Sequence, residues 1–257
     1  MPPPVPQHFD LIENTDRDVV LFSSAYPNGH VVDAHSHRRF QLLYVRTGTM
    51  QLETEFGAWI VPPGFAVWIP PNVVHQLRTI NVTTCNLYFR EKAVSPAPKR
   101  CQVVEVSPLL RELINEALSV PVLYEPRSRD WQLMKMLLQE AVIQPVVPLH
   151  LPMPRDERLA KLCRAFFKAP TQASTPAQWA GQLHISGRTF YRRFVAGTGI
   201  TFVNWRQQAC VISAMARLSL GDSVTRVALD MGYESPSSFS AMFKKATGRS
   251  PSVYARS

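Results

Sequence analysis

A repeated pattern of phenylalanine and glycine constrains the last third of this 257-residue chain more than any other feature. The pattern Phe-x3-Phe-x4-Gly occurs at Phe190, Phe194 and Gly199, and again at Phe239, Phe243 and Gly248. Ser186 and Ser235 precede the two copies at the position of a helix N-cap. Each copy therefore predicts a short helix, a tight turn and a second helix held by aromatic side chains one turn apart, which is a helix-turn-helix. An ordinary helical bundle is the alternative, but it does not account for two copies in register.

The positive charge of the chain is concentrated in the same region. The chain carries 28 Lys and Arg against 19 Asp and Glu, a net charge of +9. Residues 1–150 hold 13 basic and 14 acidic residues, whereas residues 151–257 hold 15 basic and 5 acidic residues. A net charge of +10 on one small domain predicts a polyanionic partner, and nucleic acid fits better than a membrane surface. A solvated basic face without a partner is the alternative.

Between the two copies, residues 201–219 contain neither proline nor glycine and predict one connecting helix. A helix of this length spans about 28 Å, since each residue adds about 1.5 Å. Successive major grooves on one face of B-DNA lie about 34 Å apart. We therefore expect a rigid connecting helix to present both second helices to adjacent grooves, so that one monomer reads an asymmetric site.

Residues 155–257 resemble the DNA-binding domain of the AraC/XylS family of transcription regulators. The most specific stretch runs from Ser223 through Gly232 and Tyr233 to Pro251 and Tyr254, and it includes the second copy of the repeat. The resemblance implies a seven-helix unit that binds specific DNA sequences. It places the first helix-turn-helix at about 176–197, the connecting helix at about 201–219 and the second helix-turn-helix at about 224–247. Cys210 stands where the family usually has an arginine, which puts the salt bridge of that arginine in question.

The same resemblance assigns the residues that contact DNA, unevenly between the two repeats. In the first repeat, Arg188, Tyr191 and Arg192 match positions that read bases in the family, and Thr189 lies beside them. We expect Arg193 to contact phosphate, with a solvated charge as the alternative. In the second repeat, the outward residues are small, namely Ser237, Ser238, Ser240 and Ala241, and the first basic residue is Lys244. We therefore expect the first helix to specify the sequence and the second mainly to position the protein on the DNA backbone.

The first hundred residues predict an antiparallel barrel or sandwich. Short β-branched and aromatic segments predict strands at Val19–Ser24, Gln41–Arg46, Gly48–Glu53, Ala58–Val61, Ala66–Ile69, His75–Ile80 and Asn86–Phe89. Turn residues separate them, among them Thr47-Gly48. Apolar residues at helical spacing then predict two helices at about 107–119 and 130–143, which either cover a face of the barrel or form a dimer contact. A proline-broken stretch at 146–154 coincides with the change in charge and predicts a semi-stiff linker that is neither regular helix nor central strand.

Residues of about 18–90 resemble a cupin barrel. Gly29-x5-His35-Ser-His37-x3-Gln41 follows the first cupin motif, and Gly64-x5-Pro70 leading to His75 follows the second. Because His35 and His37 alternate on one predicted strand, their side chains should share a face, and His75 should join them from another strand. Three imidazoles suit zinc, iron or nickel. Gln41, however, stands where a metal-binding cupin has glutamate, so we favour an effector pocket of His35, His37, Gln41 and His75 with no metal and no cofactor.

These observations predict an α+β protein of two domains: a cupin-like antiparallel β-barrel followed by two helices (1–145), a linker (146–154), and an all-α domain with two helix-turn-helix motifs (155–257). We expect a transcription regulator that senses a small molecule, binds double-stranded DNA, contacts RNA polymerase and forms a homodimer. A metal-dependent cupin enzyme fused to a DNA-binding domain is the main alternative, and a purely architectural basic protein is another. No catalytic triad, phosphate loop or nucleotide fingerprint occurs, so we expect no enzymatic activity.

The remaining sequence signals concern location and cysteine chemistry. Residues 1–6 have neither the basic nor the apolar region of a secretory signal, and nowhere do 18 apolar residues run together. Cys85, Cys101, Cys163 and Cys210 form no CxxC pair. We therefore expect a cytoplasmic protein without membrane association, whose thiols are reduced and mostly buried.

Overall fold

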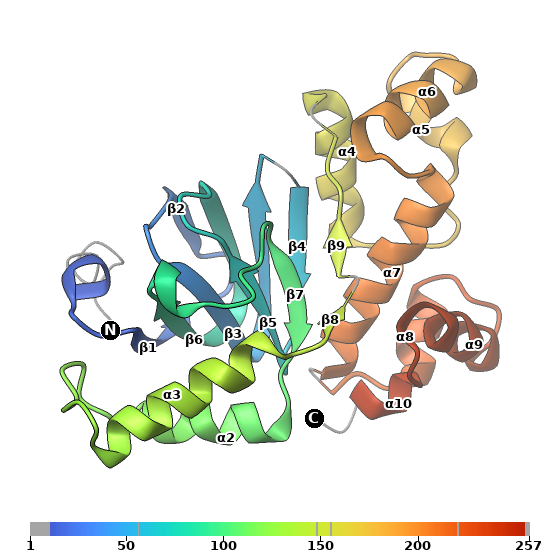
Figure 1. Ribbon diagram of the computed structural model, residues 1–257. Coiled ribbons are helices and arrows are strands. Elements are labelled where there is room, and N and C mark those ends of the chain that lie inside the picture. Colours follow the sequence, from blue (N-terminus) through green and yellow to red (C-terminus); the bar gives the residue numbers. More distant parts are fainter. Residues whose placement is uncertain (1–10, 56, 148, 155, 220, 255–257) are drawn as a thin grey trace. The chain divides into compact units, whose positions relative to one another are not determined.

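The computed structural model describes residues 11–254 except 56, 148, 155 and 220 (Figure 1). The chain divides into two compact units. One consists of Met1–Glu55 and Val61–Pro148, and the other of Phe56–Ile60 and Leu149–Ser257. The first is dominated by an antiparallel sheet and the second by helices, so the predicted α+β class is confirmed. None of the described helices is long and apolar enough to cross a membrane.

The first unit is built on strands that pair in the order β1-β6-β3-β5-β7-β8, with β2 also paired to β6. Their bounds are β1 Val19–Tyr26, β2 Val31–His35, β3 Phe40–Thr54, β5 Phe65–Ile69, β6 His75–Phe89, β7 Gln102–Glu105 and β8 Val146–Val147. Each pair within this unit is antiparallel. The long β3–β6 pairing forms the centre of the sheet and joins Phe40 to Phe89 at one end and Thr54 to His75 at the other.

Two long strands replace four of the strands that the sequence predicts. Thr47–Gly48, predicted as a turn, lies inside β3, where the register with β6 shifts on both sides of Thr47. Gly48 has a positive φ of 71°, so the glycine accommodates a bulge rather than a chain reversal. Neither β2 nor β7 is among the strand segments predicted from β-branched and aromatic residues, because both are short and mix valines with charged or polar residues; only the cupin motif placed His35 on a strand.

Two helices cover one face of the sheet: α2 (Pro108–Ala117) and α3 (Arg129–Val142), which lie side by side in Figure 1. Ser107 and Ser128 cap their N-termini by accepting hydrogen bonds from the backbone N–H groups of Leu110 and Trp131. The sheet contributes Leu42, Tyr44, Trp68 and Leu87 to the shared core, and the helices contribute Leu110, Ile114, Met134 and Leu137. Since β-strand side chains alternate, Gln41 and Tyr88 lie on the opposite face, which we call the inner face of the sheet.

The predicted linker contains short strands. β8 pairs with β7, and β9 (His150–Leu151) pairs with β4 (Gly57–Val61) through Ala58 with Leu151 and Trp59 with His150. The rings of Trp59 and His150 stack with centroids 4.7 Å apart. Pro145 precedes β8 and Pro152 follows β9, and proline donates no backbone hydrogen bond, so both strands stay at two residues.

The second unit contains seven helices within its described residues, the number that the family resemblance implies. They are α4 (Glu157–Lys168), α5 (Pro176–Gln182), α6 (Gly187–Thr198), α7 (Phe202–Ser219), α8 (Val224–Asp230), α9 (Pro236–Thr247) and α10 (Pro251–Tyr254). The two repeats are α5–α6 and α8–α9. As predicted, Ser186 and Ser235 cap α6 and α9 by accepting from backbone N–H groups.

An aromatic cluster holds the first repeat. Trp179 of α5 contacts Phe190 and Phe194 of α6 at ring-centroid distances of 6.3 and 6.2 Å. It also contacts Phe202 and Trp205 of α7 at 4.8 and 5.9 Å. Both repeat phenylalanines are fully buried, as are their counterparts Phe239 and Phe243 in the second repeat. Their burial leaves the opposite face of α6 and of α9 free of core contacts.

The loop between α4 and α5 contacts both the second repeat and the connecting helix α7. The backbone N–H of Gln172 donates to the carbonyl of Met231 at 2.9 Å, next to the α8–α9 turn. Arg206 of α7 donates to the carbonyl of Ser174 in the same loop. Cys210 stands where the family usually has an arginine. Arg206 lies one turn earlier on the same helix, and its hydrogen bond holds this loop.

All four cysteines are free and buried, which confirms the prediction for their thiols. Burial raises the pKa of each thiol, and that of Cys101 and of Cys210 reaches about 12. The thiols are therefore protonated at neutral pH and poorly nucleophilic.

We expect Gly232→Ala to lower the free energy of unfolding more than Gly248→Ala. Both glycines have positive φ, 78° and 77°, so both changes incur the left-handed backbone strain of about 1–2 kcal/mol. Only at Gly232 does an added Cβ approach a neighbour closely, at 3.0 Å from Thr171 Oγ1, whereas Gly248 has nothing within 4 Å. Urea unfolding measures the difference, and equal losses would contradict the role of the α4–α5 loop at this turn.

Candidate DNA-reading helices and a polar cluster in the sheet

The exposed face of α6 carries two guanidinium groups and a phenol. Arg188, Tyr191 and Arg192 are spaced i, i+3 and i+4, so they share one face, and all three are exposed. The buried pair Phe190 and Phe194 fixes the opposite face. Tyr191 is 58% exposed, so its ring and hydroxyl are accessible beside the two guanidinium groups.

Thr189 and Arg193 lie beside this face rather than on it. Thr189 is half-buried, and its hydroxyl accepts a hydrogen bond from the capping Ser186 at 3.0 Å. Arg193 lies 3.9 Å from Asp156, the N-cap residue of α4. Both members of this pair are exposed, so the interaction is weak and leaves the guanidinium available for another anion.

Helix α9 has the same scaffold with a different outward face. When the buried phenylalanines are aligned, Ser237 takes the place of Arg188 and Ala241 takes the place of Arg192. Ser237, Ser238 and Lys244 are exposed, while Ser240 is half-buried. The hydroxyl of Ser238 donates to the carbonyl of Ser235 at 2.8 Å, within the N-cap of the helix. Lys244 lies in the last turn of α9.

The three histidines of the sequence-predicted pocket gather in the first unit, but not by strand alternation. His35 ends β2, His37 lies in the loop before β3, and His75 begins β6. The prediction that His35 and His37 alternate on one strand is therefore wrong, because β2 ends between them. The ring centroids of His35 and His75 lie 4.3 Å apart, and those of His37 and His75 lie 5.2 Å apart.

Gln41 connects this cluster to the inner face of the sheet. His37 Nε2 donates to Gln41 Oε1 at 2.9 Å. Gln41 Nε2 in turn donates to Asn86 Oδ1 at 2.9 Å and to the Tyr88 hydroxyl at 3.2 Å. The sequence predicted Gln41 in this site, whereas Asn86 and Tyr88 follow no motif and were missed; only their place on β6 opposite β3 reveals them.

Burial disfavours the charged form of the two inner histidines, His37 and His75. It lowers the pKa of His37 and of His75, that of His75 to about 3, and the nearby charge of His35 lowers both further. His75 Nδ1 donates to the carbonyl of Val73 at 2.8 Å. His75 Nε2 is buried and has no hydrogen-bond partner among the described residues.

The geometry does not fit the metal site kept as an alternative. Within the described part of the chain, no group of three or more His, Cys, Asp and Glu side chains is placed to hold a metal ion. His37 already uses Nε2 for Gln41. The cavity beside the cluster, lined by His35, Gln41, Asn86 and Tyr88 among others, has a volume of about 40 Å³. That volume accommodates about one water molecule.

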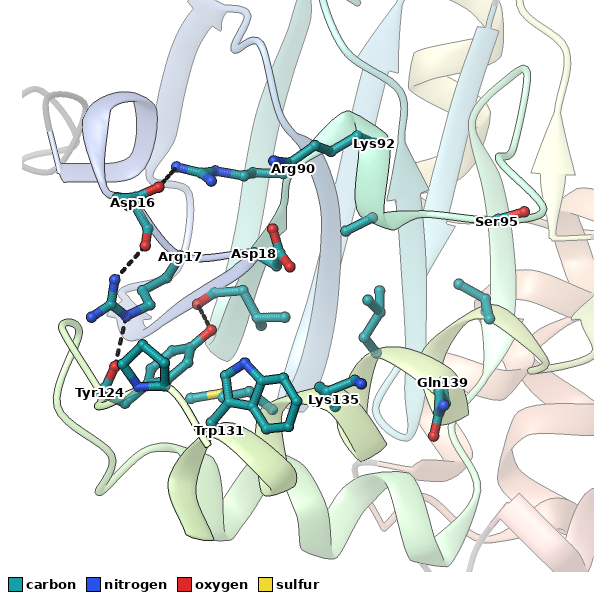
Figure 2. Close-up of a pocket in the computed structure, with 16 residues that line it drawn as sticks. Asp16, Arg17, Asp18, Arg90, Lys92, Ser95, Tyr124, Trp131, Lys135 and Gln139 are labelled. Atoms are coloured by element: carbon teal, nitrogen blue, oxygen red, sulfur yellow. Dashed lines mark hydrogen bonds and ion pairs between the residues drawn. The ribbon is translucent and has the colours of Figure 1, made fainter. Parts of the chain in front are cut away.

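A larger pocket lies on the other side of the sheet, along α3 (Figure 2). Its volume is about 550 Å³. Its lining comes from the start of β1, the segment after β6, the α2–α3 loop and α3 itself. No motif marks these segments, so sequence reasoning missed the pocket.

We expect the protein to lose stability as the pH falls below about 6.5. The pKa of His75 in the folded state lies below its unfolded value of about 6.5. At pH values between these two, the unfolded chain binds more protons than the folded protein does. Proton binding therefore lowers the free energy of the unfolded state relative to that of the folded state. Urea unfolding at pH 7 and at pH 5 measures the loss. His75→Leu should reduce the pH dependence, while changing the exposed His184 to Asn should leave it intact. Equal slopes for wild type and His75→Leu would show that His75 is not the group responsible.

Comparison with known proteins agrees with this architecture. A helix-turn-helix domain family matches residues 179–257, and the AraC-like ligand binding domain family matches residues 19–190. The regulator NimR of Escherichia coli K12 is 35% identical over 221 residues, covering 86% of this chain and 81% of NimR. RipA of Corynebacterium diphtheriae is 35% identical over 108 residues, covering 42% of this chain and 31% of RipA.

Among solved structures, apo ToxT from Vibrio cholerae overlaps with a TM-score of 0.39 and 12% identity, covering 94% of this chain and 98% of ToxT. The family assignment depends on the sequence matches. The ligand-binding family alone matches more than half of the chain, and NimR is similar over most of its length. This protein therefore belongs to the AraC family and is a DNA-binding transcription regulator with an N-terminal ligand-binding domain.

Proposed function

We propose that α6 reads the DNA sequence and that α9 mainly holds the DNA backbone. The observation that supports this division is the difference at equivalent positions, where Arg188 and Arg192 of α6 correspond to Ser237 and Ala241 of α9. An arginine forms two hydrogen bonds with guanine O6 and N7, a contact that discriminates by about 1–3 kcal/mol. Serine and alanine at the same places offer no such contact with guanine.

In this proposal, exposed side chains that do not distinguish between bases contact the DNA backbone. Arg193 and Lys244 supply positive charge, and the Ser237 and Ser238 hydroxyls supply hydrogen bonds to phosphate oxygens. Tyr191 lies beside Arg188 and Arg192 and contacts the bases with them, while Thr189 supports the start of the helix. Helix α7, with 18 residues, spans about 27 Å and spaces the two repeats for adjacent major grooves.

The ligand-binding domain senses its effector, in this proposal, through His35, His37, Gln41 and His75. The unpartnered Nε2 of His75 provides a hydrogen-bonding group for a small polar molecule. Because the cavity holds about one water molecule, binding there requires the lining side chains to move outward. The effector acts by favouring one arrangement of the protein over another, without catalysis and without a metal.

Residues 1–145 form the sensing and dimerisation domain, 146–154 the linker and 155–257 the DNA-binding domain. A homodimer forms through α2 and α3, where Leu109 and Met136 are exposed apolar side chains. Bound at a promoter in the cytoplasm, the protein contacts RNA polymerase.

We expect Arg188→Ser, which copies Ser237, to relax base preference at one position of the DNA site. The loss removes one bidentate contact and should reduce discrimination there by about 1–3 kcal/mol. Binding to a randomised pool of sites, sequenced before and after selection, measures the preference. Ser237→Ala is the matched control and should leave the preferred sequence unchanged. An unaltered preference in Arg188→Ser would rule out α6 as the reading helix.

We expect Lys244→Gln to weaken binding to all DNA sequences alike. A phosphate contact carries no base information, so its loss should lower the slope of log affinity against log salt by about 1 without changing the preferred site. Fluorescence anisotropy over a salt series measures both quantities. A change in sequence preference instead would mean that Lys244 reaches the bases.

A further inference from the structure

The larger pocket in the first unit is a preformed cavity that no sequence motif predicts. Its volume of about 550 Å³ lies in the range of sites that hold small organic molecules. Its walls are the residues before β1, the short helix η1 (Glu91–Ala93) after β6, the α2–α3 loop and one side of α3. Figure 2 shows Arg90 and Lys92 on one side and Trp131, Lys135 and Gln139 of α3 across from them.

One wall of this pocket is apolar. Met134, Leu138 and Val142 line it along successive turns of α3, and Trp131 lies at the start of that row. Val19 adds an apolar side chain from β1. A hydrocarbon or aromatic body placed along this row buries apolar surface from water, which is the main source of affinity in such sites.

The polar wall has a positive balance. The lining includes the basic residues Arg17, Arg90, Lys92 and Lys135 and the acidic residues Asp16 and Asp18. Four cations thus face two carboxylates, although residues 1–150 together carry a net charge of −1. The pocket is therefore a local concentration of positive charge in a domain that has no such excess.

Two of these cations already have hydrogen-bond or ion-pair partners, and the other two form no ion pair. Arg90 lies 2.7 Å from Asp16, and Arg17 Nε donates to the carbonyl of Tyr124 at 2.6 Å. Lys92 and Lys135 form no ion pair with any described residue. The two lysines are exposed, so an anion in the pocket can neutralise them without breaking an existing ion pair.

The aromatic rings do not favour a cationic ligand. Lys135 Nζ lies 4.5 Å from the centroid of the Trp131 ring, and the Arg17 guanidinium lies 5.4 Å from that of the Tyr124 ring. The protein's own cations thus occupy the ring faces that attract positive charge. An organic cation would meet four positive charges, and it would compete with Lys135 and Arg17 for the rings of Trp131 and Tyr124.

We propose that this pocket binds an amphipathic organic anion, with its acidic group at Lys92 and Lys135 and its apolar body along Met134, Leu138 and Val142. The site is separate from the histidine cluster, since the two cavities share no lining residue. The pocket also lies on the helix-covered side of the sheet, whereas Gln41 and Tyr88 lie on the inner face. An experiment that disproves ligand binding at one of these sites therefore leaves the proposal for the other site unaffected.

Displacement of a fluorescent probe from the full-length protein tests the charge preference. The probe is 8-anilinonaphthalene-1-sulfonate, an aromatic anion whose emission rises in apolar surroundings. Octanoate, octan-1-ol and octylammonium share one chain and differ in head-group charge. We expect octanoate to displace the probe at the lowest concentration and octylammonium at the highest, and added salt to narrow the difference. Equal displacement by all three would overturn the proposal.

Charge variants on exposed side chains test the location without disturbing the fold. Lys92→Gln combined with Lys135→Gln should weaken probe and octanoate binding about tenfold, since exposed charge pairs contribute about 2- to 5-fold each. Asp18→Asn should tighten binding about 2- to 5-fold for the same reason. Lys99→Gln, an exposed lysine outside the pocket, is the matched control and should change nothing.

A second readout separates this pocket from binding elsewhere on the surface. Trp131 lines the pocket, so Trp131→Phe should reduce energy transfer from tryptophan to the bound probe. If the probe binds but neither this transfer nor the affinity of the lysine variants changes, the anion lies at another place and the proposal is wrong. The DNA preference of Arg188→Ser and the pH dependence of His75→Leu are measured independently of this outcome.

Discussion

The pairing of β3 with β6 is the interaction on which the first unit depends. It runs from Phe40–Phe89 to Thr54–His75 and so extends along the whole length of both strands. Because side chains alternate along it, Leu42 and Leu87 pack under α2 and α3 while Gln41 lies among polar groups on the inner face. Both candidate small-molecule sites follow from this one ladder. His75 at the beginning of β6 enters the histidine cluster, and Arg90, just beyond its end, lines the pocket along α3.

In the second unit, scaffold and recognition are carried by different residues of the same helices. Trp179 and the paired phenylalanines determine how α6 is held, and the equivalent Phe239 and Phe243 hold α9. The outward positions take no part in this packing. Arginine at position 188 of α6 and serine at the equivalent position 237 of α9 are therefore compatible with the same fold. The two repeats can contact different groups although their packing is the same.

The sequence predicts what depends on local or periodic patterns. The caps at Ser186 and Ser235 and the buried phenylalanines follow from spacing within a dozen residues. The turn at Thr47–Gly48 was wrong because a glycine with positive φ serves a bulge as well as a reversal, and only the partner strand decides between them. The pocket along α3 could not be predicted, because Asp18, Lys92 and Lys135 come together only once the sheet and helix are packed.

The pairing of β4 with β9 bears on how the protein can be divided. Residues 58 and 59, which come from the middle of the sheet-forming sequence, take their partners from residues 150 and 151. A fragment that ends at residue 148 would keep Ala58 and Trp59 but lose the strand and the imidazole that cover them. Unpaired strand edges with exposed aromatic side chains promote aggregation. A soluble sensor fragment thus requires the chain to extend through Leu151, beyond the point where the change in charge would suggest cutting it.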